Sequence, residues 1–132
     1  MIVVVDASAA TEYLLRTHLG ELVAGLFEGA QLAAPELMDA EVLSVLRREV
    51  HKGHLTERRA QEALADLTLW GLERISHRLL LKGAWALRGH VSAYDALYVS
   101  AARALGALLV TADGPLSRAR NLHVAVHNIR MA

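Results

Sequence analysis

Ile2-Val3-Val4-Val5-Asp6-Ala7-Ser8, at the start of the chain, joins a short run of β-branched residues to an abrupt polar ending. A continuous apolar run of this length predicts a strand that is buried on both faces, as the strands of parallel sheets are. In open α/β sheets, ligands bind just beyond the carboxyl ends of the strands. Asp6 therefore stands where a functional site is expected, and the acids elsewhere in the chain are the groups that could join it.

Strands and amphipathic helices alternate along the rest of the chain. Further strands are predicted at 31–34, 72–76, 107–111 and 123–126, and helices at 7–16, 19–27, 35–50, 79–88 and 92–105, with another after Thr56 and a short one after Asp113. Pro35 is expected in the first turn of its helix, where its missing N–H costs nothing. This alternation predicts one α/β domain over residues 1–132, built on a mostly parallel sheet.

The composition indicates a folded domain without disulfides. Hydrophobic residues make up 54% of the 132 residues, and there is no cysteine to form a disulfide or a thiolate metal site. No uncharged apolar run approaches the roughly 18 residues of a membrane span, so no membrane location is expected. A cysteine-free chain favours the reducing cytoplasm as its location.

The formal net charge is zero, with 14 basic and 14 acidic residues, whereas nucleic-acid binders are usually basic. If four acids belong to a metal site, ten remain against the 14 basic residues, which leaves an excess of four positive charges. Most of these basic residues are Arg, the side chain best suited to phosphate. The composition is therefore compatible with a nucleic-acid substrate.

Four acids stand where one site could gather them. Asp6 and Asp113 each follow a strand of the buried type. Asp95 falls in the first turn of a predicted helix, and Glu41 lies at the margin of the apolar stripe of another. Taken singly, each acid could be a helix cap or a surface residue. Taken together, carboxylates in one cleft would raise one another's pKa, and a divalent cation such as Mg²⁺ or Mn²⁺ would relieve their repulsion. Such all-carboxylate sites are typical of enzymes that act on phosphates.

The acids lie within four segments, which are Val4–Ser8, Pro35–Leu46, Tyr94–Ala102 and Leu109–Leu116. In their order and spacing these segments resemble the PIN domain, and specifically the small VapC-like toxin nuclease of VapBC toxin–antitoxin pairs. The resemblance covers nearly the whole chain. It implies a PIN-like three-layer α/β/α fold, in which a mostly parallel central sheet is flanked by helices.

The same resemblance implies a role for each acid. Asp6, Glu41, Asp95 and Asp113 would bind Mg²⁺ or Mn²⁺ and carry the catalysis, and the hydroxyls of Ser8 and Thr111 would orient these carboxylates. The activity of the family is metal-dependent endoribonuclease cleavage, with tRNA or rRNA as frequent targets. Family members commonly form homodimers and are inhibited by a VapB-like antitoxin, so RNA, an antitoxin and a second copy are the expected partners.

Basic residues close to these acids along the chain are candidates for binding the RNA phosphates. Arg47 and Arg48 come after Glu41, Arg88 comes before Asp95, and Arg118 comes after Asp113. For each of them, an ordinary place on the protein surface is the alternative interpretation.

Three other functions share parts of this pattern, and the sequence speaks against the third. A PIN-like scaffold could bind RNA or a protein without cleavage, although the complete set of acids speaks against it. An RNA-processing PIN nuclease without an antitoxin would use the same residues. A phosphoryl-transfer enzyme of the haloacid-dehalogenase or response-regulator type also begins with an Asp at a strand end. Such enzymes need a second Asp two residues later or a Lys after a late strand, whereas Ser8 follows here and the lysines are Lys52 and Lys82.

Overall fold

In the computed structural model, which describes residues 1–131, five strands form one sheet in the order β3-β2-β1-β4-β5. The strands are β1 (Ile2–Val5), β2 (Gln31–Pro35), β3 (Glu73–Ile75), β4 (Leu108–Thr111) and β5 (Val126–Asn128). All four neighbouring pairs are parallel, which confirms the predicted parallel sheet. The chain proceeds from β1 outward to one edge through β2 and β3, and then returns to the other side of β1 at β4. The direction of the chain therefore reverses between β1 and β4, which is where open parallel sheets leave a crevice at their carboxyl ends.

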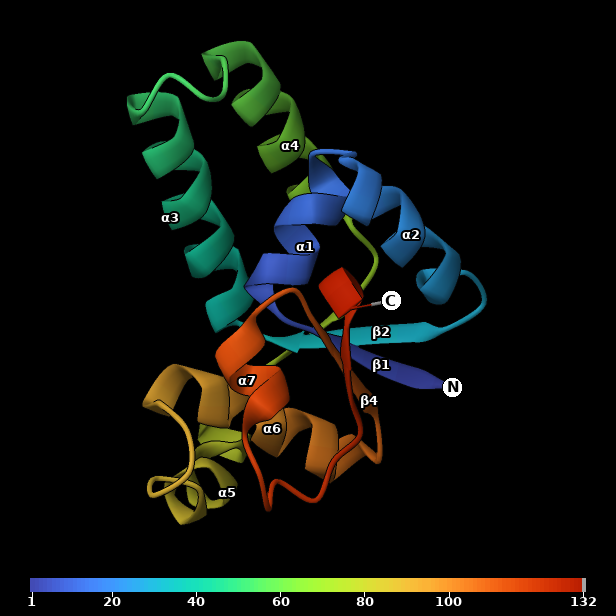
Figure 1. Cartoon of the computed structure of the whole chain (residues 1–132), viewed down its shortest axis with the longest axis vertical. Helices are drawn as coiled ribbons and strands as arrows, with labels where there is room; N and C mark the ends of the chain where they lie inside the picture. The colour runs from blue at the N-terminus through green and yellow to red at the C-terminus, as the bar shows by residue number, and fades with distance from the viewer. Residues whose placement is uncertain (132) are drawn as a thin grey trace.

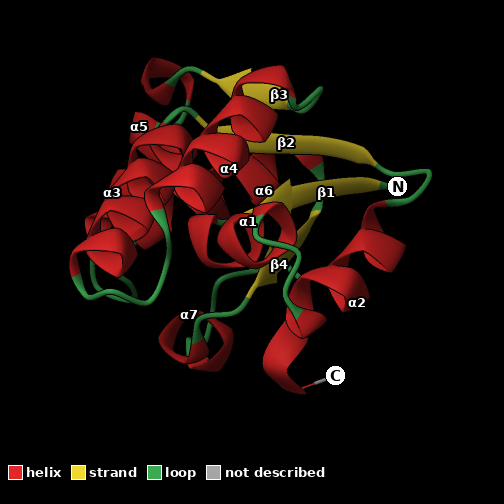
Figure 2. Ribbon diagram, turned by 90° about the horizontal axis from the view of Figure 1, so that it is seen from above, coloured by secondary structure: helices red, strands yellow, loops and turns green. Residues whose placement is uncertain are grey.

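The sheet lies between two layers of helices (Figures 1 and 2). The helices are α1 (Ala7–Leu14), α2 (His18–Phe27), α3 (Leu37–His51), α4 (Glu57–Leu69), α5 (Leu81–Ala86), α6 (Ala93–Leu105) and α7 (Gly114–Arg118), and 3₁₀ turns cover η1 (His77–Leu79) and η2 (Ile129–Met131). Helices α1 to α4 cover one face of the sheet, and α5 and α6 cover the other (Figure 1). Within residues 1–131, no helix has both the length and the apolarity that crossing a lipid bilayer requires.

The core is centred on β1. Val3, Val4 and Val5 are fully buried, as the continuous apolar run predicts. Small residues on α1, including Ala9 and Ala10, are fully buried as well, and let this helix lie close to the sheet. Because β1 is covered on both faces, the polar residue that follows it, Asp6, is buried as well.

The structure corrects the expected place of Pro35. This residue ends β2 opposite Ile75, and α3 begins two residues later at Leu37. The backbone N–H of Glu36 donates to the carbonyl of Ile75 on β3. Since successive N–H groups of a strand point to opposite sides, the nitrogen of Pro35 faces β1, whose pairing with β2 ends at Val4 and Ala33. A proline is therefore tolerated there, because the ladder needs no donor at that point.

The last strand also differs from the prediction. It was expected at 123–126, but β5 runs from Val126 to Asn128 and pairs with Leu109–Thr111. Asn121 and His123 have φ of 62° and 56°, in the left-handed region that no strand uses. The apolar residues near position 124 therefore belong to the turn that leads into β5.

The contact between α1 and α2 predicts opposite effects for two glycines of α2. A Cβ on Gly20 would collide with the backbone carbonyl of Glu12, whereas a Cβ on Gly25 would meet nothing within 4 Å. We expect Gly20→Ala to lower the free energy of unfolding by about 1–3 kcal/mol through overpacking. Gly25→Ala should raise it by about 0.5–1 kcal/mol, since alanine favours the helix. Urea unfolding of both variants measures the difference, and equal effects would contradict the close approach of α1 and α2.

Candidate active site

All four predicted acids line one cavity of about 380 Å³ at the carboxyl ends of β1 and β4. Asp6 follows β1 and Asp113 follows β4, so the crevice at the reversal of the sheet brings these two together. Glu41 reaches the cavity from α3, and Asp95 reaches it from the first turn of α6. Residues up to 107 positions apart in the chain thus meet in one site, as the sequence predicted.

Asp6 is the most buried of these acids, with 5% of its surface exposed. Its Oδ1 accepts hydrogen bonds from the backbone N–H of Ala9 at 3.0 Å and from the Ser8 hydroxyl at 2.6 Å. Its Oδ2 accepts a short hydrogen bond from the Thr111 hydroxyl. The bond to Ala9 makes Asp6 the N-cap of α1. The same carboxylate therefore starts a helix and faces the cavity.

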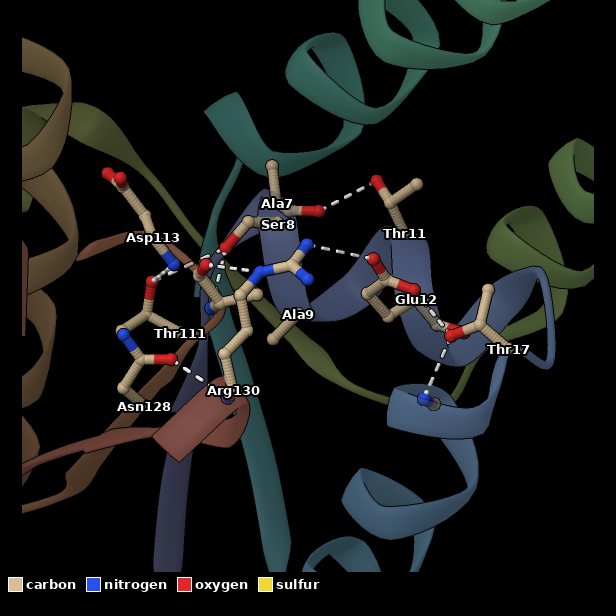
Figure 3. A network of polar contacts seen from close by, with 12 residues as sticks. Ala7, Ser8, Ala9, Thr11, Glu12, Thr17, Thr111, Asp113, Asn128 and Arg130 are labelled. Carbon is tan, nitrogen blue, oxygen red and sulfur yellow. Dashed lines mark hydrogen bonds and ion pairs between the residues drawn. The ribbon is translucent and has the colours of Figure 1, made fainter. Parts of the chain in front are cut away.

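The hydroxyls of Ser8 and Thr111 join the ends of β1 and β4 (Figure 3). Ser8 Oγ accepts the backbone N–H of Ala112 at 2.8 Å, and Thr111 Oγ1 accepts the backbone N–H of Asp113 at 2.8 Å. Since both hydroxyls donate to Asp6, they hold the Asp6 carboxylate and the backbone that carries Asp113 in a fixed relation.

Glu41 is held by Tyr98, which is not among the site residues predicted from the sequence. The Tyr98 hydroxyl on α6 donates to Glu41 Oε1 at 2.6 Å. Burial raises the pKa of Tyr98 above its usual range, so the hydroxyl keeps its proton and remains a donor. Tyr98 lies three residues after Asp95 and Ser44 three after Glu41, and each pair shares a helix face toward the cavity. This three-residue spacing is the signal in the sequence from which both residues could have been selected.

Asp95 lies in the first turn of α6, where Ser92 is the N-cap. The Ser92 hydroxyl accepts the backbone N–H of Asp95 at 3.2 Å. The Asp95 carboxylate lines the cavity from this first turn.

The acids act on one another electrostatically. Burial raises the pKa of Asp6 from 3.8 to about 6, against the hydrogen bonds that lower it, and the charge of Asp113 raises it further. Burial also raises the pKa of Asp95, helped by Asp113, and that of Glu41, helped by Asp95. The four carboxylates therefore form a continuous series of like charges, which makes the cavity strongly attractive to a cation.

The donor set fits a hard divalent cation. The cavity offers carboxylate and hydroxyl oxygens, the ligands that Mg²⁺ and Mn²⁺ prefer. Among residues 1–131, no group of three or more His, Asp or Glu side chains has a geometry that could hold a metal ion. What favours a divalent cation here is therefore the chemistry of the oxygen ligands that line the cavity.

Of the four predicted RNA-binding arginines, the structure brings one to the cavity. Arg48 lines it, one helical turn beyond Ser44 on α3. Arg47, the residue before it, lines a separate groove between α3 and α4. Arg88 lies over the ring of Trp85, with its Cζ 4.8 Å from the ring centroid. Arg118 ends α7, outside the cavity lining.

Residues 3–122 match the family described as the PIN domain. The chain therefore belongs to the PIN-domain family. This agrees with the resemblance that the four sequence segments indicate.

Within this family, the chain is similar to ribonuclease VapC1 of Mycobacterium tuberculosis, with 37% identity over 129 residues, covering 96% of this chain and 97% of VapC1. It shares its fold with PAE2754 of Pyrobaculum aerophilum, with a TM-score of 0.70 at 21% identity over 99% of this chain and 91% of the other. The structure of VapBC2 of Rickettsia felis, bound to a DNA fragment from its promoter, also matches. There the TM-score is 0.65 at 18% identity, over 97% of this chain and 98% of the other.

The raised pKa of Asp6 predicts how stability depends on pH when no metal is present. Below about pH 4, Asp6 is protonated in the folded and unfolded protein alike, whereas between pH 4 and 6 the folded protein holds the proton more tightly. Stability due to this group is therefore lost as the pH rises to about 6. The loss is about 3 kcal/mol for a shift of this size.

Asp6→Asn should remove the pH dependence due to this group, because an amide does not titrate in this range. The amide can still accept from Ala9 and Ser8 and donate to Thr111, so the fold is kept. The comparison is urea unfolding of both proteins in EDTA between pH 4 and 7. The variant should become the more stable protein as the pH rises. A constant difference across this range would contradict the raised pKa.

Proposed function

We propose that this protein is a VapC-like toxin: a Mg²⁺- or Mn²⁺-dependent endoribonuclease that acts in the cytoplasm and is inhibited by a VapB-like antitoxin. The observation that carries the proposal is the meeting of Asp6, Glu41, Asp95 and Asp113 in one cavity. The identity with ribonuclease VapC1 over nearly the whole length of both chains supports the same activity. The absence of cysteine from the sequence supports the location.

The proposed role of the acids is to hold the metal, and that of the hydroxyls is to orient the acids. A bound Mg²⁺ or Mn²⁺ would supply the positive charge that activates water and stabilises the transition state of phosphodiester hydrolysis. The products would carry a 5′-phosphate and a 3′-hydroxyl. Ser8 and Thr111 fix the Asp6 carboxylate, and Tyr98 fixes one oxygen of Glu41. Because these partners sit on β4, α1 and α6, the carboxylates are held by rigid elements.

The RNA backbone is proposed to approach the cavity beside Arg48. This arginine is the basic side chain that shares the cavity lining with the acids. Its guanidinium suits a phosphate next to the scissile one, because it can form two parallel hydrogen bonds to phosphate oxygens. The proposed substrates are structured RNAs such as tRNA or rRNA.

The antitoxin and a second copy are the proposed protein partners. The antitoxin fits an acidic cavity by offering it a basic side chain, which would neutralise the carboxylates as a metal does. The similarity of this fold to the VapBC2 structure of Rickettsia felis supports such a partner. Trp85 and Tyr94, 69% and 61% exposed beside one groove, support an interface with a second copy.

Removal of one metal ligand should abolish cleavage without loss of the fold. We expect Asp95→Asn to lower the rate of RNA cleavage in Mn²⁺ by about a hundredfold or more, since the neutral amide no longer binds the cation. Asp66→Asn is the matched control, because Asp66 forms a surface ion pair with Arg16 at 4.0 Å, away from the cavity. The measurement is cleavage of a labelled RNA, with circular dichroism to show that both variants are folded.

Excess EDTA should stop cleavage by the wild-type protein, and added Mn²⁺ should restore it. Full activity of Asp95→Asn, or of the wild type in EDTA, would overturn the metal-dependent mechanism.

Arg48 should contribute one phosphate contact. Arg48→Gln should weaken RNA binding and reduce the slope of log K against log salt by about 0.7–1. Arg58→Gln is the control, because Arg58 is exposed on α4 and its substitution removes the same charge at a different place. Each arginine substitution is made in the Asp95→Asn protein, which does not cut the RNA. RNA binding is then measured between about 50 and 200 mM salt. Equal slopes for both arginine variants would argue against the contact.

A further inference from the structure

The peptide group between Ala112 and Asp113 is held at both of its ends. Its carbonyl, on Ala112, accepts a hydrogen bond from Arg130 Nε at 3.0 Å. Its N–H, on Asp113, donates to Thr111 Oγ1 at 2.8 Å. Because a peptide group is planar, bonds at both ends fix its orientation, and with it the direction in which the next side chain leaves the backbone. That next side chain is Asp113, one of the four acids of the cavity.

Arg130 is itself fixed, although it comes from the last residues that the structure describes. Its backbone N–H donates to Asn128 Oδ1 at 2.9 Å, and its Nη2 donates to Glu12 Oε1 at 3.2 Å. Asn128 pairs with Thr111 in the sheet, and its Nδ2 donates to Ser117 Oγ on α7 at 3.1 Å. The guanidinium thus bridges α1 and the turn between β4 and α7 (Figure 3).

The turn that carries Asp113 depends on such support. Asp113 occupies the N-cap position of α7, yet its side chain makes no capping hydrogen bond to this helix in the described part of the chain. Its carboxylate lines the cavity instead. The orientation of Asp113 is therefore set through its backbone, and the backbone before it is held by Arg130 and Thr111.

We propose that Arg130 is a positioning residue for Asp113: by holding the Ala112 carbonyl, it directs the Asp113 carboxylate into the cavity so that it can bind the divalent cation. Arg130 itself lies outside the lining of the cavity and acts through the backbone. This inference rests on the metal-dependent function proposed above. It assigns a role in the site to a C-terminal residue that the sequence pattern did not mark.

The charge of Arg130 and its positioning role predict opposite changes in the affinity for a cation when Arg130 is substituted. Removal of the positive charge of Arg130, which lies next to the turn that carries Asp113, would by electrostatics alone strengthen the binding of a cation. Loss of a group that orients a ligand weakens metal binding, typically by a factor of about ten or more. The direction of the change in affinity therefore distinguishes positioning from a simple charge effect.

The experiment is a calorimetric titration of the metal-free protein with Mn²⁺, which needs no RNA and no turnover. We expect Arg130→Gln to bind Mn²⁺ about tenfold more weakly than the wild type. The Arg130 side chain is 54% exposed, so loss of its ion pair with Glu12 leaves the protein folded. Glu12→Gln is the matched control: it removes the ion pair but leaves the bond from Arg130 to Ala112, so its affinity should stay within about twofold of the wild type.

A double variant tests whether the effect passes through Asp113. On an Asp113→Asn background, Arg130→Gln should cause little further loss of affinity, because the ligand it positions is already gone. Hydrogen exchange of the Asp113 amide gives a readout without metal, and should be faster in Arg130→Gln and unchanged in Glu12→Gln.

Each outcome bears on one proposal. Unchanged or tighter Mn²⁺ binding by Arg130→Gln, an equal loss on the Asp113→Asn background, or unchanged amide exchange would overturn the positioning role. Failure of the wild type itself to bind Mn²⁺ would instead overturn the proposed metal-dependent function, and the amide exchange would still report on Arg130.

Discussion

The burial of the Asp6 carboxylate at the end of β1 is the constraint on which the rest of this structure depends. A charged group in this place must be satisfied, and three donors satisfy it: Ala9, Ser8 and Thr111. The first starts α1, and the last belongs to β4, so one side chain fixes how the first strand, its helix and the neighbouring strand meet. Burial nevertheless keeps the pKa of Asp6 raised, so its charged form remains costly until a cation or a basic group compensates for it.

The other acids follow the same plan, in which a structural partner holds one part of the residue and leaves the carboxylate available. Ser92 satisfies the N–H of Asp95, Tyr98 binds one oxygen of Glu41, and the Ala112–Asp113 peptide is held by Thr111 and Arg130. The site is therefore supported by α1, α6, β4 and the segment after β5. Such support is what holds repelling carboxylates close together, because each is tied to a rigid element rather than to its neighbours.

Much of this could be predicted from the chain. The apolar run before Asp6 predicts a strand in a parallel sheet, and the four acids are recognised because each sits at a strand end or on an apolar helix face. The prediction is wrong for Pro35, because hydrophobic periodicity does not show that the end of β2 needs no backbone N–H at this position. It is also wrong for the last strand, because periodicity does not show the left-handed turn that precedes β5. The four arginines are predicted from their nearness to the acids along the chain, but Arg48 alone of them lines the cavity. Arg47 faces another groove, because consecutive residues of a helix are rotated by about a quarter turn.

The sequence by itself determined the type of fold and the acids at its centre, because burial patterns and strand ends are local properties that neighbouring residues specify. Only the tertiary structure decided which side chains hold those acids. Helical spacing marks Tyr98 as a residue that faces the cavity, but its bond to Glu41 spans 57 positions and that of Arg130 to Ala112 spans 18, so no local pattern identifies the bonded partner. These bonds arise from the order of the strands, which places the ends of β1 and β4 at one cavity with α3 and the first turn of α6, and which sets β5 beside β4.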